Sequence, residues 1–82
     1  MQKFIKYLES IGFKPEGEFA KIEPHSIWLY RGDDWVSVYK SINSKYKGHY
    51  CKVYTKNAIR TSDYESTRVK DVLQWLKVAI DY

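Results

Sequence analysis

Apolar residues near the N-terminus recur with a helical spacing. They occupy positions i, i+1, i+4 and i+7 of a single stripe: Phe4, Ile5, Leu8 and Ile11. This spacing predicts a helix over about residues 2–11. Gly12 suits a helix C-terminus, and Pro15 prevents the helix from continuing.

The C-terminal segment has a second stripe with a period of 3.6 residues. Its members are Val69, Val72, Leu73, Leu76, Ala79 and Ile80, with Trp75 beside them. They predict a helix that begins at about 63–67 and ends near residue 80. Ser62 with Glu65 matches a capping box, and Ser66 is a competing N-cap.

Between the two predicted helices the pattern changes to alternation, which is typical of strands. A weak strand "EFAKIE" is followed by "SIWLYR", by the turn "RGDD", by "WVSVYK", by the polar loop "SINSKYKG" and by "HYCKVYTK". The predicted fold class is therefore α+β: an N-terminal helix, a three- to four-stranded antiparallel sheet and a C-terminal helix. With 82 residues the chain is expected to form a single domain over residues 1–82.

Alternation also sorts the strand residues into two faces. One face is aliphatic and suits a core packed against helices: Ile27, Leu29, Val36, Val38, Cys51 and Val53. The other face is aromatic, with one lysine: Trp28, Tyr30, Trp35, Tyr39, Tyr50, Lys52 and Tyr54. If both helices cover the aliphatic face, six aromatic side chains lie towards solvent, and such a patch indicates an interface. The alternatives are that the aromatic face is the core or packs on a second copy, because aromatic residues also stabilise sheets by cross-strand pairing.

The net charge of +4 arises from one part of the chain. Residues 36–62 carry six basic and no acidic residues, whereas 1–35 and 63–82 each carry a net charge of −1. A localised positive charge suggests a polyanion or an acidic protein surface as partner. Tyrosines are interleaved with the basic residues of this stretch: Lys45, Tyr46 and Lys47 fall on the predicted loop, and Lys56 ends the strand "HYCKVYTK".

Two partner classes fit basic residues among aromatic ones. RNA or single-stranded DNA would stack bases on tyrosine and tryptophan while lysine neutralises phosphates. An acidic protein surface or a nucleoprotein complex would use the same residues as anchors. Salt separates the two, because counterion release makes nucleic-acid binding strongly salt-dependent.

The candidates for catalysis are few. His25 follows Pro24 in a predicted turn, and His49 shares a strand face with Cys51, which as the only cysteine is expected to be a small core residue. Two histidines and one cysteine without close spacing do not suit a metal site, and no glycine loop for phosphate is present. We therefore expect no enzyme activity, no cofactor and no metal.

The opening "FIKYLESIGFK", followed by a strand region with His25, resembles small mRNA-interferase toxins of the HicA type. That resemblance implies a helix–three strands–helix fold related to double-stranded-RNA-binding domains, and a catalytic histidine early in the sheet. The Gly-Ser-His-His signature of those toxins is absent, and "EPHSIW" offers only His25.

A second resemblance is to small phage anti-CRISPR proteins of the αβ type. The segments "KFIKYL", "VSVYK", "DYEST" and "LQWL" are similar to segments of one such inhibitor in the same order. The resemblance implies that Tyr7 and Tyr39 contribute to docking on a CRISPR surveillance complex. In that group the first segment is a strand, whereas the spacing here predicts a helix.

The sequence thus predicts a non-catalytic binding protein, an accessory inhibitor of phage or mobile-element type that docks on a host nucleic-acid-handling complex. A direct binder of RNA or single-stranded nucleic acid and a HicA-like mRNA interferase are the alternatives. A single cysteine, no signal peptide and no long apolar run favour a cytoplasmic protein, in the host cytoplasm if phage-encoded, without membrane contact. Either a monomer or a homodimer is compatible with the sequence.

Overall fold

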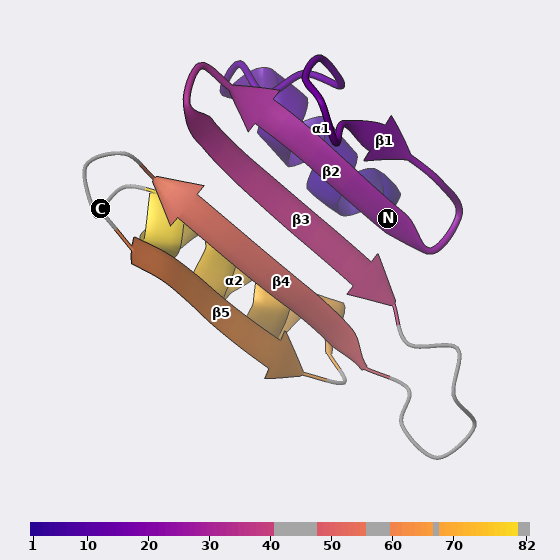
Figure 1. Ribbon diagram of the computed structural model, residues 1–82. Coiled ribbons are helices and arrows are strands. Elements are labelled where there is room, and N and C mark those ends of the chain that lie inside the picture. Colours follow the sequence, from indigo (N-terminus) through magenta and orange to yellow (C-terminus); the bar gives the residue numbers. More distant parts are fainter. Residues whose placement is uncertain (41–47, 56–59, 67, 81–82) are drawn as a thin grey trace.

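A computed structural model describes residues 1–40, 48–55, 60–66 and 68–80 (Figure 1). For strand residues 50, 52, 53, 55 and 60–66 only the backbone is described. The elements follow in the order α1 (Gln2–Ser10), β1 (Lys21–Ile22), β2 (Ser26–Arg31), β3 (Asp34–Lys40), β4 (His49–Thr55), β5 (Arg60–Ser66) and α2 (Val69–Ile80). The sheet is antiparallel with the strand order β1-β2-β3-β4-β5, so each strand pairs with its neighbour in sequence.

Both helices cover the same face of this sheet, as the alternation predicts. In Figure 1, α1 lies behind β2 and α2 behind β4 and β5. The buried residues of the two helices join the aliphatic strand residues in one core: Phe4, Ile5, Leu8, Phe13, Ile27, Leu29, Val36, Val38, Cys51, Val72, Leu76 and Ile80. The α+β architecture, with the core between the helices and one sheet face, is confirmed.

Helix α1 ends where the sequence predicts it. The amides of Gly12 and Phe13 donate to the carbonyls of Glu9 and Leu8 at 3.1 and 3.0 Å. Gly12 has a φ of +95°, which a residue with a side chain rarely adopts, and its reversal brings Phe13 back onto the core. The Arg31 guanidinium then lies over the Phe13 ring, 4.6 Å from its centroid. These contacts tie the end of the helix to β2.

The turn "RGDD" joins β2 to β3 as a two-residue hairpin loop, because Arg31 pairs directly with Asp34. Gly32 has a φ of +61°, as the first loop residue of such a hairpin requires. Across the turn, the Arg31 and Asp34 side chains form an ion pair of 3.3 Å. The Arg-Gly-Asp triplet is therefore a structural hairpin.

The start of the C-terminal helix differs from the prediction. Ser62, Glu65 and Ser66 belong to β5, so the capping box is wrong, and α2 begins at Val69. The segment "RTSDYES" has a single large apolar residue, Tyr64, and gives no visible alternation. It becomes a strand because it pairs with all seven residues of β4. This is a tertiary effect, which the local sequence pattern cannot predict. Within the described residues the sheet consequently has five strands, one more than the largest predicted number.

Helix α2 itself presents its predicted apolar stripe to the core through Val72, Leu76 and Ile80. Asp71 in its first turn and Lys77 in its last turn have the signs that the helix dipole favours. Among the described residues, no helix combines the length and the apolar character that crossing a membrane requires.

Candidate binding face of the sheet

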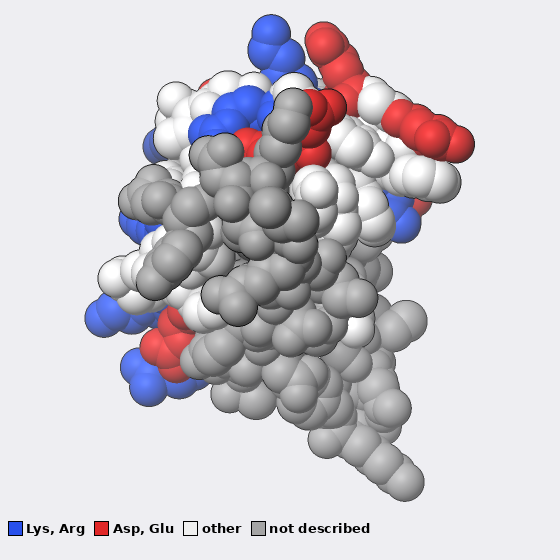
Figure 2. All heavy atoms as spheres, turned by 60° about the vertical axis from the view of Figure 1, so that its left-hand side comes forward, with Lys and Arg blue, Asp and Glu red and all other residues white. Residues whose placement is uncertain are grey.

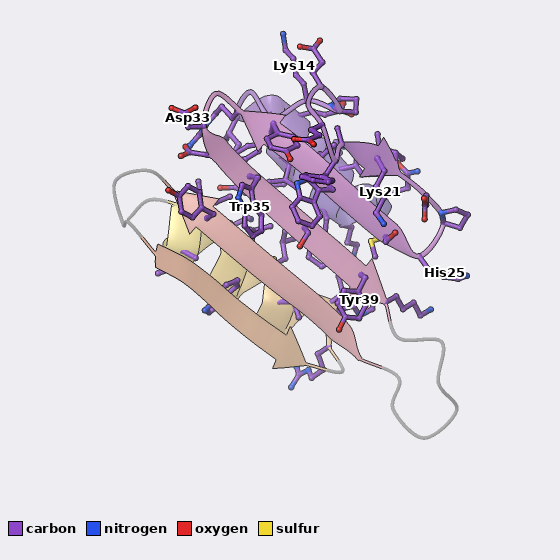
Figure 3. All side chains as sticks on the ribbon, in the orientation of Figure 1. Lys14, Lys21, His25, Asp33, Trp35 and Tyr39 are labelled. Carbon is purple, nitrogen blue, oxygen red and sulfur yellow. The ribbon has the colours of Figure 1, made fainter. Side chains whose placement is uncertain are left out.

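The face of the sheet opposite the helices carries aromatic side chains from three neighbouring strands. The strand registers place Tyr30 opposite Trp35, and Trp35 opposite Tyr54. We call this side the aromatic face and define it by its described aromatic residues: Trp28, Tyr30, Trp35, Tyr39 and Tyr54. In Figure 3 the labelled Trp35 and Tyr39 side chains stand on the side of the sheet turned away from the helices.

Four of the rings in this region form a row that crosses the strands. Phe19 lies 6.0 Å from Trp28 between ring centroids, Trp28 stacks on Trp35 at 4.8 Å, and Trp35 stacks on Tyr54 at 5.9 Å. The interplanar angles of the two stacked pairs are 25° and 13°. We call Phe19, Trp28, Trp35 and Tyr54 the aromatic row. Its inner rings turn their faces towards one another, so a partner meets mainly their edges.

Phe19 was not predicted as part of this surface. It precedes β1 in the acidic segment "EGEFAK", and its side chain is 60% exposed. The weak strand predicted over "EFAKIE" includes Phe19, but β1 begins only at Lys21, and the sequence offers no other signal than a single large apolar residue beside glutamates.

The aromatic face is less open than the sequence predicts. The segment before β1 pairs with the edge of β2, where Lys14 exchanges two backbone hydrogen bonds with Tyr30 at 2.7 and 2.9 Å, and Gly17 then packs against the Tyr30 ring. Trp28, Tyr30, Trp35 and Tyr54 are half-buried. Tyr39 is the most open member of the face, at 46% exposure. The expectation that all six aromatic side chains lie towards solvent is corrected accordingly.

A hollow of about 500 Å³ opens beside the aromatic row, over β1, β2 and β3. Its lining includes Lys21, Ser26, Trp28, Ser37 and Tyr39. Trp28 lies opposite Ser37, and Tyr39 lies opposite Ser26, so large and small residues occupy alternate corners of a square. The two serines are too short to fill the space between the two rings, and the hollow results.

The positive charge of residues 36–62 has acidic neighbours that the sequence analysis missed. Because β5 pairs with β4, Asp63 lies opposite Lys52, and Glu65 lies opposite Tyr50 in the sheet. On the face drawn in Figure 2, both basic and acidic side chains occur among the described residues.

Several predicted binding residues are not placed. Lys45, Tyr46, Lys47 and Lys56 lie outside the described residues. Tyr50 and Lys52 are placed only by their backbone in β4.

Cys51 is a core residue, as predicted. Its side chain has no exposed surface, and burial raises the pKa of the thiol to about 12, so the thiolate that nucleophilic chemistry requires is disfavoured. His49 is 8% exposed and lies against the Phe4 ring, with 6.0 Å between ring centroids. Burial lowers the pKa of His49, and the positive charges of the chain N-terminus and Lys40 lower it further.

His25 lies in the exposed turn between β1 and β2. Its backbone carbonyl accepts a hydrogen bond of 2.8 Å from the amide of Lys40, the last residue of β3. No group of three potential metal ligands occurs within the described ranges.

The two tyrosines implied by the anti-CRISPR resemblance fall on opposite sides of the sheet. Tyr39 lies on the aromatic face, whereas Tyr7 belongs to α1, packs against the core and has the Lys77 ammonium 5.2 Å from its ring centroid. The segment "KFIKYL" is helical. Comparison with protein-family models, with curated proteins and with solved structures finds no match to this chain.

Proposed function

We propose that this protein is a non-catalytic binding protein that docks on a partner protein through the aromatic face. The observation that carries the proposal is the aromatic row beside an open hollow, on the sheet face that neither helix covers. Tryptophan and tyrosine supply large contact areas at low entropic cost and are the residue types that dominate binding energy at protein interfaces.

The geometry of the rings favours a protein over nucleic acid. Base stacking requires a ring face that is open to the incoming base. Trp28 stacks on Trp35, and Trp35 stacks on Tyr54, so the inner rings of the row offer mainly their edges. Side chains of a partner protein pack against ring edges as readily as against faces.

The charges on the sheet point the same way. A groove for a nucleic-acid strand carries basic residues along its length. Here Asp63 and Glu65 lie opposite Lys52 and Tyr50 of β4, and the described part of the face in Figure 2 carries both signs of charge. A protein surface with both signs suits this pattern better than a polyanion does.

The role that we propose is that of a small accessory inhibitor that docks on a component of a nucleic-acid-handling complex. The resemblance of "VSVYK" and its companion segments to phage inhibitors supports this choice of partner. No catalysis is part of the proposal, and Cys51, buried in the core, has a structural role in it.

Direct binding of RNA or single-stranded DNA is the second candidate, because all six basic residues of 36–62 fall in or beside the β3–β4 and β4–β5 hairpins. Titration with a labelled oligonucleotide at low and moderate salt tests it. A steep loss of affinity with salt would support this candidate against the protein partner.

The partner class is tested by affinity capture from bacterial cells, with and without nuclease treatment. We expect a protein that remains bound after nuclease treatment and is lost when Tyr39→Ala and Tyr54→Ala are combined. Val78→Ala is the matched control, since Val78 is an exposed apolar residue on α2, on the other side of the sheet. The proposal would be contradicted if nuclease treatment abolished capture. It would also be contradicted if the wild type, the double variant and Val78→Ala captured the partner equally well.

A further inference from the structure

The hollow beside the aromatic row has the shape of a socket. Trp28 and Tyr39 stand at diagonal corners on β2 and β3, and diagonal neighbours in an antiparallel pair are about 7–8 Å apart. Ile27 and Val38, which also line the hollow, direct their own side chains into the core, so the floor is backbone. A volume of about 500 Å³ lies within the range of ligand sites, roughly 300–1,000 Å³.

The charge of the socket comes from one residue. Among the described residues that line the hollow, Lys21 is the only charged one. The register places it directly opposite Trp28, so the ammonium group and the indole border the same opening. Figure 3 shows Lys21 extending from β1 on the same side of the sheet as Tyr39.

The neighbouring carboxylate is already engaged. Glu23 lies beyond the rim, where its Oε2 accepts a hydrogen bond of 3.1 Å from the Ser26 hydroxyl. Its side chain borders a separate depression that also includes Met1, Ile5 and Ile22. Glu23 keeps its negative charge, but it does not line the hollow, so Lys21 is the only charged side chain among the described lining residues.

We propose that this hollow binds a short acidic segment of the partner protein. An aromatic side chain of that segment enters between Trp28 and Tyr39, and a carboxylate next to it pairs with the Lys21 ammonium. The inference rests on the proposed function and specifies the chemistry of the partner. One aromatic anchor with one adjacent carboxylate matches the two features that the hollow offers: ring-lined walls and a single cation.

Trp28 provides a direct reporter of occupancy. Its Nε1–H is inaccessible to solvent and has no acceptor among the described residues. The chain contains three tryptophans, and only Trp28 lines the hollow, whereas Trp75 is on α2. The three indole N–H signals of ¹⁵N-labelled protein can be assigned by replacing each tryptophan with phenylalanine.

The test titrates the full-length labelled chain with two acetylated, amidated tripeptides, Glu-Phe-Glu and Lys-Phe-Lys. We expect the acidic peptide to shift the Trp28 indole signal saturably, with a dissociation constant on the order of 1 mM, as befits a single anchor. The Trp75 signal should stay in place. The basic peptide should bind at least about tenfold more weakly, because it meets the Lys21 ammonium with like charge.

Two variants and one control sharpen the result. Ser37→Leu fills the hollow at a strand position that accepts leucine. It should raise the dissociation constant of the acidic peptide at least about tenfold. Lys21→Glu should reverse the preference in favour of the basic peptide. Lys70→Glu makes the same charge change at an exposed position of α2, and it should leave the preference intact, because salt screens distant surface charges.

The absence of a saturable Trp28 shift would overturn the inference, as would equal affinity for the two peptides or undiminished binding in Ser37→Leu. A short oligothymidylate that shifts Trp28 while the acidic peptide does not would overturn it in favour of nucleic acid. If the peptides fail but the Tyr39→Ala, Tyr54→Ala protein still loses its partner, the socket is wrong and the proposed function stands. If the peptides bind but that protein still retains its partner, the hollow binds acidic peptides but is not the site that the partner uses, and the proposed function falls.

Discussion

Trp28 and Trp35 stack on neighbouring strands, with 4.8 Å between ring centroids and 25° between ring planes. The two residues are diagonal neighbours, since Trp28 pairs with Ser37 and Trp35 with Tyr30. Each ring therefore leans across the strand boundary. The contact forms the centre of the aromatic row.

The stack should appear as a coupling energy. In a double-mutant cycle with Trp28→Ala and Trp35→Ala, we expect the two losses of unfolding free energy to differ from additivity by about 0.5–1.5 kcal/mol. Urea denaturation measures each variant. A cycle between Trp35→Ala and Val78→Ala, on opposite sides of the sheet, is the control and should be additive within about 0.5 kcal/mol. Additivity in the Trp28–Trp35 cycle would contradict the stacking.

Gly17 should be intolerant of any side chain. It has a φ of +138°, and a Cβ added to it would lie 2.6 Å from Cδ2 of the Tyr30 ring. We expect Gly17→Ala to lower the unfolding free energy by about 1–3 kcal/mol, from backbone strain and overlap together.

Two comparisons check the origin of that loss. Gly32→Ala meets no atom within 4 Å at a φ of +61°, so it should carry the backbone cost alone, about 1 kcal/mol. The effect of Gly17→Ala should shrink when Tyr30→Ala removes the ring. An equal effect in both backgrounds would show that Tyr30 does not lie against Gly17.

The thiol of Cys51 should resist modification in the folded protein. Burial raises its pKa to about 12, so at pH 8 almost no thiolate is present, and the side chain has no exposed surface. We expect a thiol reagent such as iodoacetamide to label the folded chain only as fast as the chain opens, and the guanidinium-unfolded chain at the rate of a free thiol. Labelling of the folded chain at the free-thiol rate would place Cys51 outside the core.

His49 should make the fold sensitive to mild acid. Burial, the chain N-terminus and Lys40 lower its pKa in the folded state from the ordinary value of 6.5. The unfolded chain therefore binds a proton first as the pH falls, so stability is full above pH 6.5 and declines below it, until the folded-state pKa is passed.

Urea denaturation between pH 7.5 and 5.5 measures this decline, which should be smaller in His49→Gln. His25→Gln removes the other histidine, in an exposed turn, and is the control. If the unfolding free energy of His49→Gln declined with pH as steeply as that of the wild type, His49 would not be the cause of the acid sensitivity.

Much of the fold follows from periodicity because the relevant contacts repeat locally. The stripe of Phe4, Ile5 and Leu8 and the alternation in β2 and β3 each identify a buried face, and both faces meet in the core. The aromatic face follows from the same alternation by elimination. The sequence pattern does not predict elements that form through pairing with a distant segment. The clearest case is β5, a polar segment with a capping-box match that becomes a strand because it pairs with β4.

The details of the site depend on contacts between segments that are far apart in sequence. Gly17 and Phe19 reach Tyr30 and Trp28 through the path of the chain before β1, and nothing in "EGEFAK" indicates that path. The acidic neighbours of Lys52 and Tyr50 are not predicted for a related reason: the pattern lets the C-terminal helix begin as early as residue 63, whereas Asp63 and Glu65 belong to β5. The hollow depends on which residues of β2 and β3 lie opposite each other. Alternation does not determine this register, because a shift of two residues keeps every side chain on the same face.

The central claim is that the aromatic face binds a partner protein. The most direct measurement is a calorimetric titration of the partner protein that remains bound after nuclease treatment. Three proteins are titrated: the wild type, the Tyr39→Ala, Tyr54→Ala double variant, and Val78→Ala. We predict that the double variant raises the dissociation constant at least about tenfold, since aromatic anchors typically contribute about 2 kcal/mol or more, while Val78→Ala leaves it unchanged. Equal dissociation constants for the wild type and a folded double variant would contradict the account.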